Sequence, residues 1–252
     1  MEHLFQLSKL DIAVDKLIYI EYDLVNKIID RLKNHEPIQY VLGETEFYGK
    51  KFKVNPSVLI PRLETEELVN LIIQENKGKQ NLNIIDFCTG SGCIAICLKT
   101  ELKNSDVVGI DISPNALDVA KQNNTINATN VNFIAKNIFE ENHFEACSVD
   151  LIVSNPPYVM EQEKRSMEKN VLNYEPALAL FVSDNDPLIF YKRLISISDF
   201  LLKPGGKCYF EINEQKGEEV KNLMTHFNFC EVKIHQDING KDRIVSGVKK
   251  KL

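Results

Sequence analysis

The sequence has no long apolar run, no Cys-x-x-Cys pair and no internal repeat. Its longest apolar runs fall far below the roughly 18 residues that cross a bilayer, and its first residues lack a basic stretch followed by an apolar one. We therefore expect a cytoplasmic protein without membrane contact. The six cysteines, three of them in or just after one glycine-rich turn, suit neither a disulfide framework nor a zinc site, so we expect no metal.

Charge of one sign is not concentrated anywhere along the chain. The 30 Lys and Arg residues and the 36 Asp and Glu residues are interspersed and give a net charge of −6. A basic face for a phosphate backbone is missing, which disfavours a DNA or RNA substrate and direct nucleic-acid binding. With 252 residues, 44% of them hydrophobic, the chain is long enough for one α/β core and a small additional domain.

The most informative stretch is Asn155-Pro156-Pro157-Tyr158, which follows the run Leu-Ile-Val-Ser at 151–154. An amide nitrogen is a poor nucleophile because its lone pair is delocalised, so an enzyme that alkylates it must hold both N–H bonds. The Asn155 side-chain oxygen can accept one N–H, the rigid prolines can fix a backbone carbonyl as the second acceptor, and Tyr158 can cover the planar group. A tight turn that closes a strand is an equal alternative for these four residues.

A glycine-rich turn, Cys-Thr-Gly-Ser-Gly at 88–92, lies upstream between a predicted buried strand at 83–87 and a helix that begins near Ile94. Gly90 and Gly92 would let the backbone approach a ligand closely, and the helix start would present unpaired N–H groups to it. Ala95 replaces the third glycine of a dinucleotide fingerprint, and no Gly-Lys-Ser/Thr follows as in a phosphate loop. An ordinary strand-to-helix turn remains an equal alternative.

Asp111 ends the next predicted strand, at 107–110, and Ser113-Pro114 then begin a helix expected over 115–124. A carboxylate at this place suits a ribose diol, because it can accept both hydroxyl protons and would repel the phosphate of NADP. Taken alone, Asp111 is equally well explained as a capping acid. Ligands of open α/β sheets collect at the carboxyl ends of the strands, and the coincidence of three such features favours a ligand site there.

Together these residues resemble the class I S-adenosylmethionine methyltransferases, and longer motifs resemble one family among them, the release-factor glutamine N5-methyltransferases (HemK or PrmC). The resemblance extends from Glu36 to Leu252. It rests on Glu-Pro-Ile-Gln-Tyr at 36–40, Leu-Ile-Pro-Arg-Leu-Glu-Thr-Glu at 59–66, the segments 86–95 and 150–158, Glu-Pro-Ala-Leu-Ala-Leu at 175–180, and Asp-Arg at 242–243.

The resemblance implies methyl transfer from S-adenosyl-L-methionine to the side-chain nitrogen N5 of the glutamine in the Gly-Gly-Gln loop of peptide chain release factors. The product would be S-adenosyl-L-homocysteine, and the modification would modulate translation termination. We expect a monomer, with residues 60–62 close to the cofactor. The residues implied for catalysis and substrate binding are Asn155, Pro156, Pro157 and Tyr158. Those implied for the cofactor are Asp86, Cys88, Thr89, Gly90, Ser91, Gly92, Asp111, Asn137, Ile138 and Asn155.

Four features depart from the pattern of that family. Cys88 replaces the usual first glycine, so a side chain borders the methionine site, and Leu63 replaces a second proline. Asn137 stands where an aspartate is common, which removes a charge from the adenine edge but keeps an acceptor. Only 35 residues precede Glu36, whereas the family usually has a larger N-terminal helical domain.

Periodicity and the resemblance together predict an α/β fold, with a Rossmann-like seven-stranded class I methyltransferase sheet. We place a small N-terminal helical domain at 1–42, a β-hairpin linker at 43–62 and the S-adenosylmethionine-dependent methyltransferase domain at 63–252. The expected elements are an amphipathic helix around 24–32, a hairpin around Gly49, a helix near 68–73, a mobile polar loop at 160–173, a helix at 187–202 stopped by Lys-Pro-Gly-Gly, a strand at 207–212, a helix at 217–227 and strands near 232 and 245.

The expected mechanism is a direct in-line displacement in which positioning supplies most of the acceleration. A strong base is not required before attack, and we expect neither Asp86 nor Glu211 to act as one. Two alternatives from other classes stay open. An adenine-N6 DNA or RNA methyltransferase would use the same four residues but would need base flipping and a basic groove. A non-enzymatic assembly protein with a decayed site is the other, although Asp111, Asn155 and Tyr158 are all present.

Overall fold

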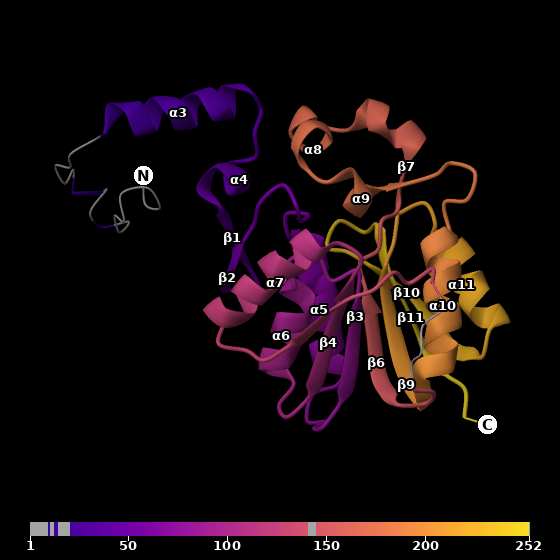
Figure 1. Ribbon diagram of the computed structural model, residues 1–252. Helices are drawn as coiled ribbons and strands as arrows, with labels where there is room; N and C mark the ends of the chain where they lie inside the picture. Colours follow the sequence, from indigo (N-terminus) through magenta and orange to yellow (C-terminus); the bar gives the residue numbers. More distant parts are fainter. Residues whose placement is uncertain (1–9, 11–12, 15–20, 141–144, 252) are drawn as a thin grey trace.

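A seven-stranded sheet in the order β10-β11-β9-β6-β3-β4-β5 forms the centre of the computed structural model, which describes residues 10, 13–14, 21–140 and 145–251 (Figure 1). Five neighbouring strands are parallel, and β11 runs antiparallel between β9 and β10. This confirms the predicted Rossmann-like sheet. The strands are β3 (Asn83–Phe87), β4 (Asp106–Asp111), β5 (Asn132–Ala135), β6 (Val149–Ser154), β9 (Leu202–Glu211), β10 (Phe229–Gln236) and β11 (Asp242–Lys249).

Helices cover both faces of the sheet, so its central strands are buried on both sides. Ile84 packs into a cluster with residues of α5 (Leu63–Glu75) and α6 (Cys93–Glu101), with α7 (Pro114–Ile126) beside α6. The next residue, Ile85, packs into a second cluster with α10 (Ile189–Leu201) and α11 (Gly217–His226). Successive side chains of a strand point to opposite faces, which explains why these strands read as continuous apolar runs.

The predicted hairpin around Gly49 is confirmed as β1 (Glu44–Phe47) and β2 (Lys50–Lys53). Its two-residue loop has positive φ at Tyr48 (50°) and Gly49 (69°), as a type I′ turn requires. Phe47 and Phe52 pack edge to face, with ring centroids 5.9 Å apart, and both belong to the core that contains α5 and α6. The hairpin is therefore anchored on the sheet domain.

Two helices precede the hairpin, α3 (Tyr22–Lys33) and α4 (Ile38–Leu42), and α3 ends before Pro37 as predicted. Glu36 forms a salt bridge with Arg31 at 2.6 Å, which stabilises the turn between the two helices. Most of the first 20 residues of the predicted helical domain at 1–42 lie outside the described residues. The boundaries that we set at 42 and 62 remain a prediction.

The prediction of a mobile loop at 160–173 is wrong, because this segment folds into short helices and a short strand. They are β7 (Val159–Met160), the 3₁₀ helix η1 (Glu161–Ser166) and α8 (Lys169–Tyr174), followed by α9 (Ala177–Leu180) and β8 (Phe181–Val182), which pairs with β7. Glu163 orders the segment, since its carboxylate accepts hydrogen bonds from the Met160 N–H at 2.7 Å and from Asn213. Polar side chains here satisfy the backbone rather than facing solvent alone.

The Lys-Pro-Gly-Gly stretch at 203–206 also differs from the prediction. It does not separate helix from strand, because β9 begins at Leu202, directly after α10. An irregularity in the pairing with β6, between Val149 and Leu151, accommodates the extra residues, and Gly205 has a φ of 83°. The glycines therefore permit a bulge inside a long strand.

Candidate active site

A cavity of about 450 Å³ lies at the carboxyl ends of β3, β4 and β6. Segments 56–62 and 176–179 close its other sides. Of the residues predicted to bind cofactor or substrate, those that line it are Cys88, Thr89, Gly90, Ser91, Asp111, Asn137, Ile138, Asn155 and Pro157. The other four, Asp86, Gly92, Pro156 and Tyr158, do not line it.

The glycine turn is held open by its backbone geometry. Cys88, Gly90 and Gly92 all have positive φ, of 58°, 53° and 79°. A Cβ atom at Gly92 would lie 2.8 Å from Cζ of Phe133, so only glycine fits there. Burial raises the pKa of the Cys88 thiol, which therefore borders the cavity as a neutral group rather than as a thiolate.

Asp111 lies opposite the turn and fixes its shape. Its carboxylate accepts hydrogen bonds from the Gly90 N–H at 2.8 Å and from the Ser113 N–H at 2.9 Å. Burial raises the pKa of Asp111, and these backbone donors oppose the rise. A carboxylate offers about four acceptor sites, so Asp111 retains acceptor capacity for a hydroxyl group of a ligand in the cavity. Asp111 is thus both a structural acceptor and a candidate ligand for a diol.

Asp86 lies beneath the turn and is fully buried. Its carboxylate accepts a hydrogen bond from the Thr89 hydroxyl at 2.6 Å, while its second oxygen is a buried atom without a partner. Burial raises the pKa of Asp86 to about 7, although the bond from Thr89 favours the ionised form. In the structure Asp86 supports the turn from below.

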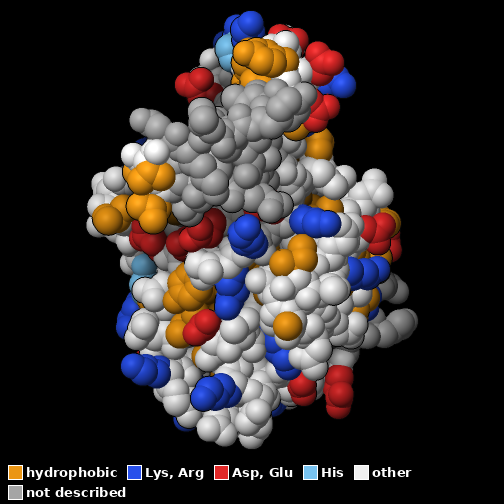
Figure 2. All heavy atoms as spheres, turned by 90° about the vertical axis from the view of Figure 1, so that its left-hand side faces the viewer, with side chains coloured by type: hydrophobic (Ala, Val, Ile, Leu, Met, Phe, Trp, Pro, Cys, Tyr) orange, Lys and Arg blue, Asp and Glu red, His pale blue; other side chains and the backbone are white. Residues whose placement is uncertain are grey.

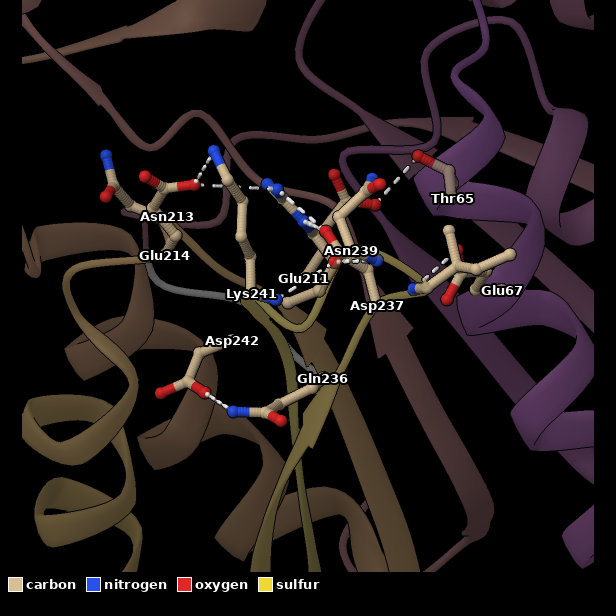
Figure 3. A network of polar contacts seen from close by, with 12 residues as sticks. Thr65, Glu67, Glu211, Asn213, Glu214, Gln236, Asp237, Asn239, Lys241 and Asp242 are labelled. Atoms are coloured by element: carbon tan, nitrogen blue, oxygen red, sulfur yellow. Dashed lines mark hydrogen bonds and ion pairs between the residues drawn. The ribbon is translucent and has the colours of Figure 1, made fainter.

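Asn155 reaches the cavity from the end of β6, and its side-chain nitrogen donates to the Thr65 hydroxyl at 3.2 Å. Thr65 in turn donates to Glu211 at 2.7 Å, from helix α5 to the end of β9, as Figure 3 shows. The second oxygen of Glu211 accepts the Tyr158 hydroxyl at 3.0 Å. One N–H of Asn155 is thus donated to Thr65, and its side-chain oxygen is a candidate acceptor for a ligand in the cavity.

Neither ionisable group behind Asn155 is suited to be a strong base. Although burial raises the pKa of Glu211, hydrogen bonds from Thr65 and Tyr158 occupy its two oxygens, and Glu211 does not line the cavity. Burial, together with the charge of Glu211, raises the pKa of Tyr158 well above its usual value, so its hydroxyl stays neutral. This geometry agrees with a reaction that depends on positioning.

The linker forms one wall of the cavity, and the closeness of residues 60–62 to the cofactor stays a prediction. Pro61 and Arg62 line the cavity. Arg62 forms a salt bridge with Glu175, whose side chain is only 1% exposed. Glu175 also accepts the Ile60 N–H at 3.1 Å, and the Tyr40 hydroxyl donates to the Val58 carbonyl at 2.6 Å. These bonds hold the linker against the sheet domain.

Comparison with known proteins places this site in a family. The family model described as "Methyltransferase small domain" matches residues 64–175. The release factor glutamine methyltransferase of Flavobacterium psychrophilum is 44% identical over 97% of this chain and 88% of its own. That of Bacteroides thetaiotaomicron is 46% identical over 93% of this chain and 87% of its own. The chain belongs to the release factor glutamine methyltransferase family. The family resemblance inferred from the motifs is thereby confirmed.

Solved structures agree on the fold of this methyltransferase. A crystal structure of a methyltransferase from Pyrococcus furiosus superposes with a TM-score of 0.58 at 16% identity, and covers 90% of this chain and 99% of its own. A ribosomal protein L11 methylase from Lactobacillus delbrueckii subsp. bulgaricus gives a TM-score of 0.53 at 19% identity, over 78% and 83%. At these identities the likeness concerns the fold alone.

The described part of the methyltransferase offers neither a metal site nor a membrane-spanning helix. Among the residues that the structure describes, no group of three or more His, Cys, Asp or Glu side chains is arranged to hold a metal ion. Within the same part of the chain, each helix is too short or too polar to span a bilayer. On the face in Figure 2, Lys and Arg side chains are dispersed among acidic and hydrophobic ones.

Sequence reasoning did not assign roles to three residues that shape this site. Thr65 appeared only within a family motif, Glu211 only as an acid not expected to act as a base, and Glu175 only within the family motif at 175–180. The signal available for Glu211 and Glu175 was an acid inside an otherwise apolar stretch. Such acids are rarely buried without partners, so each pointed to a polar contact of unknown identity.

Proposed function

We propose that this methyltransferase transfers a methyl group from S-adenosyl-L-methionine to the N5 nitrogen of the glutamine in the Gly-Gly-Gln loop of peptide chain release factors. S-adenosyl-L-homocysteine is the second product. The observation that carries the proposal is that Asn155 lines the same cavity as Gly90 and Asp111. A side-chain acceptor for a planar NH2 group thus lies beside a turn and a carboxylate suited to a nucleoside.

The chemistry of the cavity fits the proposed cofactor. The positive φ of Gly90 brings backbone close to the cavity without a side chain, and Asp111 retains acceptor sites for ribose hydroxyls. A phosphate in the same place would be repelled by Asp111. Asn137 and Ile138 line the same space and would border the adenine. When bound, the cofactor supplies an electrophilic methyl group on a positively charged sulfur.

The residues of the chain then position the substrate amide. The Asn155 oxygen accepts one N–H of the glutamine, and a carbonyl held by the rigid Pro156-Pro157 pair accepts the other, so the nitrogen lone pair points to the methyl carbon. Pro157 lines the cavity, and Tyr158 stands behind it. Orientation of this kind contributes on the order of 7–11 kcal/mol in intramolecular reactions, far more than a single hydrogen bond.

We further propose that the enzyme works as a monomer in the cytoplasm and that the methylation modulates translation termination. The dispersed charge in Figure 2 supports a protein substrate rather than a nucleic acid. An adenine would also require a basic groove that stabilises the unpaired strand.

Methyl transfer to a release factor tests the proposal directly. We expect label from radioactive S-adenosylmethionine to appear in a release factor with an intact Gly-Gly-Gln loop. Exchange of this glutamine for alanine should abolish the labelling. Equal labelling of the alanine variant, or labelling of DNA or RNA instead, would exclude the proposed target.

A further inference from the structure

We propose that Glu211 is a positioning residue that determines which atom of Asn155 faces the substrate, and that it acts through the hydroxyl of Thr65. The inference rests on the proposed function, because it assigns Asn155 the role of acceptor. Glu211 itself stands one residue behind the cavity lining, to which Thr65 and Asn155 belong. Its effect on the reaction is therefore indirect.

Glu211 is placed as an acceptor for two hydroxyl donors. It ends strand β9 and is 1% exposed. Oε2 accepts the Thr65 hydroxyl at 2.7 Å and Oε1 accepts the Tyr158 hydroxyl at 3.0 Å. The nearby Arg243 pairs with Asp237 at 3.1 Å rather than with Glu211. The carboxylate is thus left to the two hydroxyls.

The count of protons then fixes the orientation of Asn155. A threonine hydroxyl has one proton. Burial raises the pKa of Glu211, but its two hydroxyl donors and the charge of nearby Arg243 favour the ionised form, and an ionised carboxylate can only accept. When Thr65 donates to Glu211, its oxygen can only accept from Asn155, so the Asn155 nitrogen must face Thr65. The Asn155 oxygen is then turned away from Thr65, toward the substrate. The two ends of an amide have almost the same shape, so packing alone would not select this orientation.

Without Glu211 the selection is lost. Thr65 could then donate to the Asn155 oxygen, and the flipped amide would present its NH2 group to the NH2 group of the substrate. Two donors cannot pair, and a buried donor without an acceptor is unfavourable. We expect the turnover number to fall roughly 10- to 100-fold when the relay is broken, with cofactor affinity within about twofold of wild type.

Two variants break the relay and two serve as controls. Thr65→Val removes the hydroxyl at nearly constant shape, and Glu211→Gln leaves a single acceptor oxygen for which the hydroxyls of Thr65 and Tyr158 compete. Thr65→Ser keeps the hydroxyl and should restore most of the activity. Glu75→Gln is the matched control, because Glu75 also accepts a tyrosine hydroxyl, from Tyr209 at 2.7 Å, but does not line the cavity.

The decisive kinetic test is a double-mutant cycle with Asn155→Ala. If the relay acts through Asn155, Thr65→Val and Glu211→Gln should lower the turnover number strongly in the wild type, but by less than about twofold in the Asn155→Ala background. Equal losses in both backgrounds would show a purely structural role and overturn the inference.

NMR separates this inference from the proposed function, because it needs no reaction. The side-chain NH2 signals of Asn155, identified by their absence in Asn155→Ala, should be protected from hydrogen exchange in the wild type. We expect the exchange of these NH2 protons to be at least about tenfold faster in Thr65→Val and Glu211→Gln. In Glu75→Gln it should keep the wild-type rate. Unchanged exchange in both relay variants would refute the inference, whether or not the wild type methylates a release factor. A wild type that is inactive on release factors but shows this pattern would refute the proposed function alone.

Discussion

The carboxylate of Glu175 accepts a hydrogen bond from the backbone N–H of Ile60 at 3.1 Å, across 115 positions of the chain. Through the same side chain, which also pairs with Arg62, the segment at 175–179 is joined to the linker that forms a wall of the cavity. Two sides of the cavity therefore depend on one buried acid.

Glu175→Gln should loosen this wall. The amide keeps one acceptor but loses the charge that balances Arg62, so we expect the free energy of unfolding to fall by about 1–3 kcal/mol. Hydrogen exchange at the Ile60 N–H, measured by NMR, should become faster. The affinity for the cofactor should also become weaker. The exposed Glu168→Gln on the same segment is the control. An unchanged rate at Ile60 would contradict this view of the wall.

Asn155→Ala should impair the chemical step and spare cofactor binding. By analogy with the removal of one positioned donor from an oxyanion hole, the loss of transition-state stabilisation should be roughly 2–4 kcal/mol. Steady-state kinetics and calorimetry of cofactor binding measure the two effects separately. Asn222→Ala, at an exposed position of α11, should leave both unchanged. Near-normal turnover of Asn155→Ala would remove this residue from the mechanism.

Asp111→Asn, in contrast to Asn155→Ala, should reduce the affinity for the cofactor. Hydrogen bonds to a charged group contribute about 1.5–3 kcal/mol, so we expect the dissociation constant for S-adenosylmethionine to rise roughly 10- to 150-fold. Isothermal titration calorimetry provides the measurement. Asp118→Asn, exposed on the outer side of α7, is the matched control. Retention of full affinity would mean that Asp111 serves only the shape of the glycine turn.

Gly92→Ala and Gly78→Ala form a matched pair that isolates a steric clash. Both glycines have positive φ, of 79° and 83°, so each variant carries a similar backbone cost of about 1–2 kcal/mol. Only at Gly92 would the new Cβ meet Phe133, at 2.8 Å, whereas nothing lies within 4 Å at Gly78. Chemical denaturation should show Gly92→Ala to be less stable than Gly78→Ala by a further 1–3 kcal/mol, approximately. Equal losses would argue against the packing of Phe133 on the turn.

Asp86→Asn should change how stability depends on pH. The pKa of Asp86 is about 7 in the folded protein and about 3.9 in an unfolded chain, so folding favours the protonated form. The contribution of protonated Asp86 to the free energy of unfolding is complete below about pH 4, and it is lost as the pH rises to about 7. Between pH 5 and pH 8 the free energy of unfolding of the wild type should fall by about 2 kcal/mol relative to the variant, as urea denaturation can measure. A constant difference across this range would be the contrary result.

The sequence allowed the sheet and the cavity edge to be predicted because their signals are local. Continuous apolar strands such as 83–87 and 149–154 end in the glycine turn and in Asn155, and ligand sites of α/β sheets lie at such ends. The contacts of Thr65 with Asn155 and of Glu175 with Ile60 join residues 90 and 115 positions apart. No local pattern reports such a pairing, because it forms only when the helices and the linker pack.

The error at 160–173 has a related cause. A polar, charged segment reads as a solvated loop, but Glu163 bonds backward to the Met160 N–H and across to Asn213, which lies 50 positions away. Composition describes what a side chain can bond to, and only the fold determines which partner it finds.

Strand β11 is the last strand along the chain, yet it lies between β9 and β10. While a ribosome is still producing residues 242–249, β9 keeps a bare edge of unpaired backbone groups and β10 has no strand to pair with. The nascent polypeptide can therefore complete its central sheet only after residues 242–249 have left the ribosome. Until then the edge of β9 stays open to pairing with other chains, so shielding by chaperones would matter most during this interval.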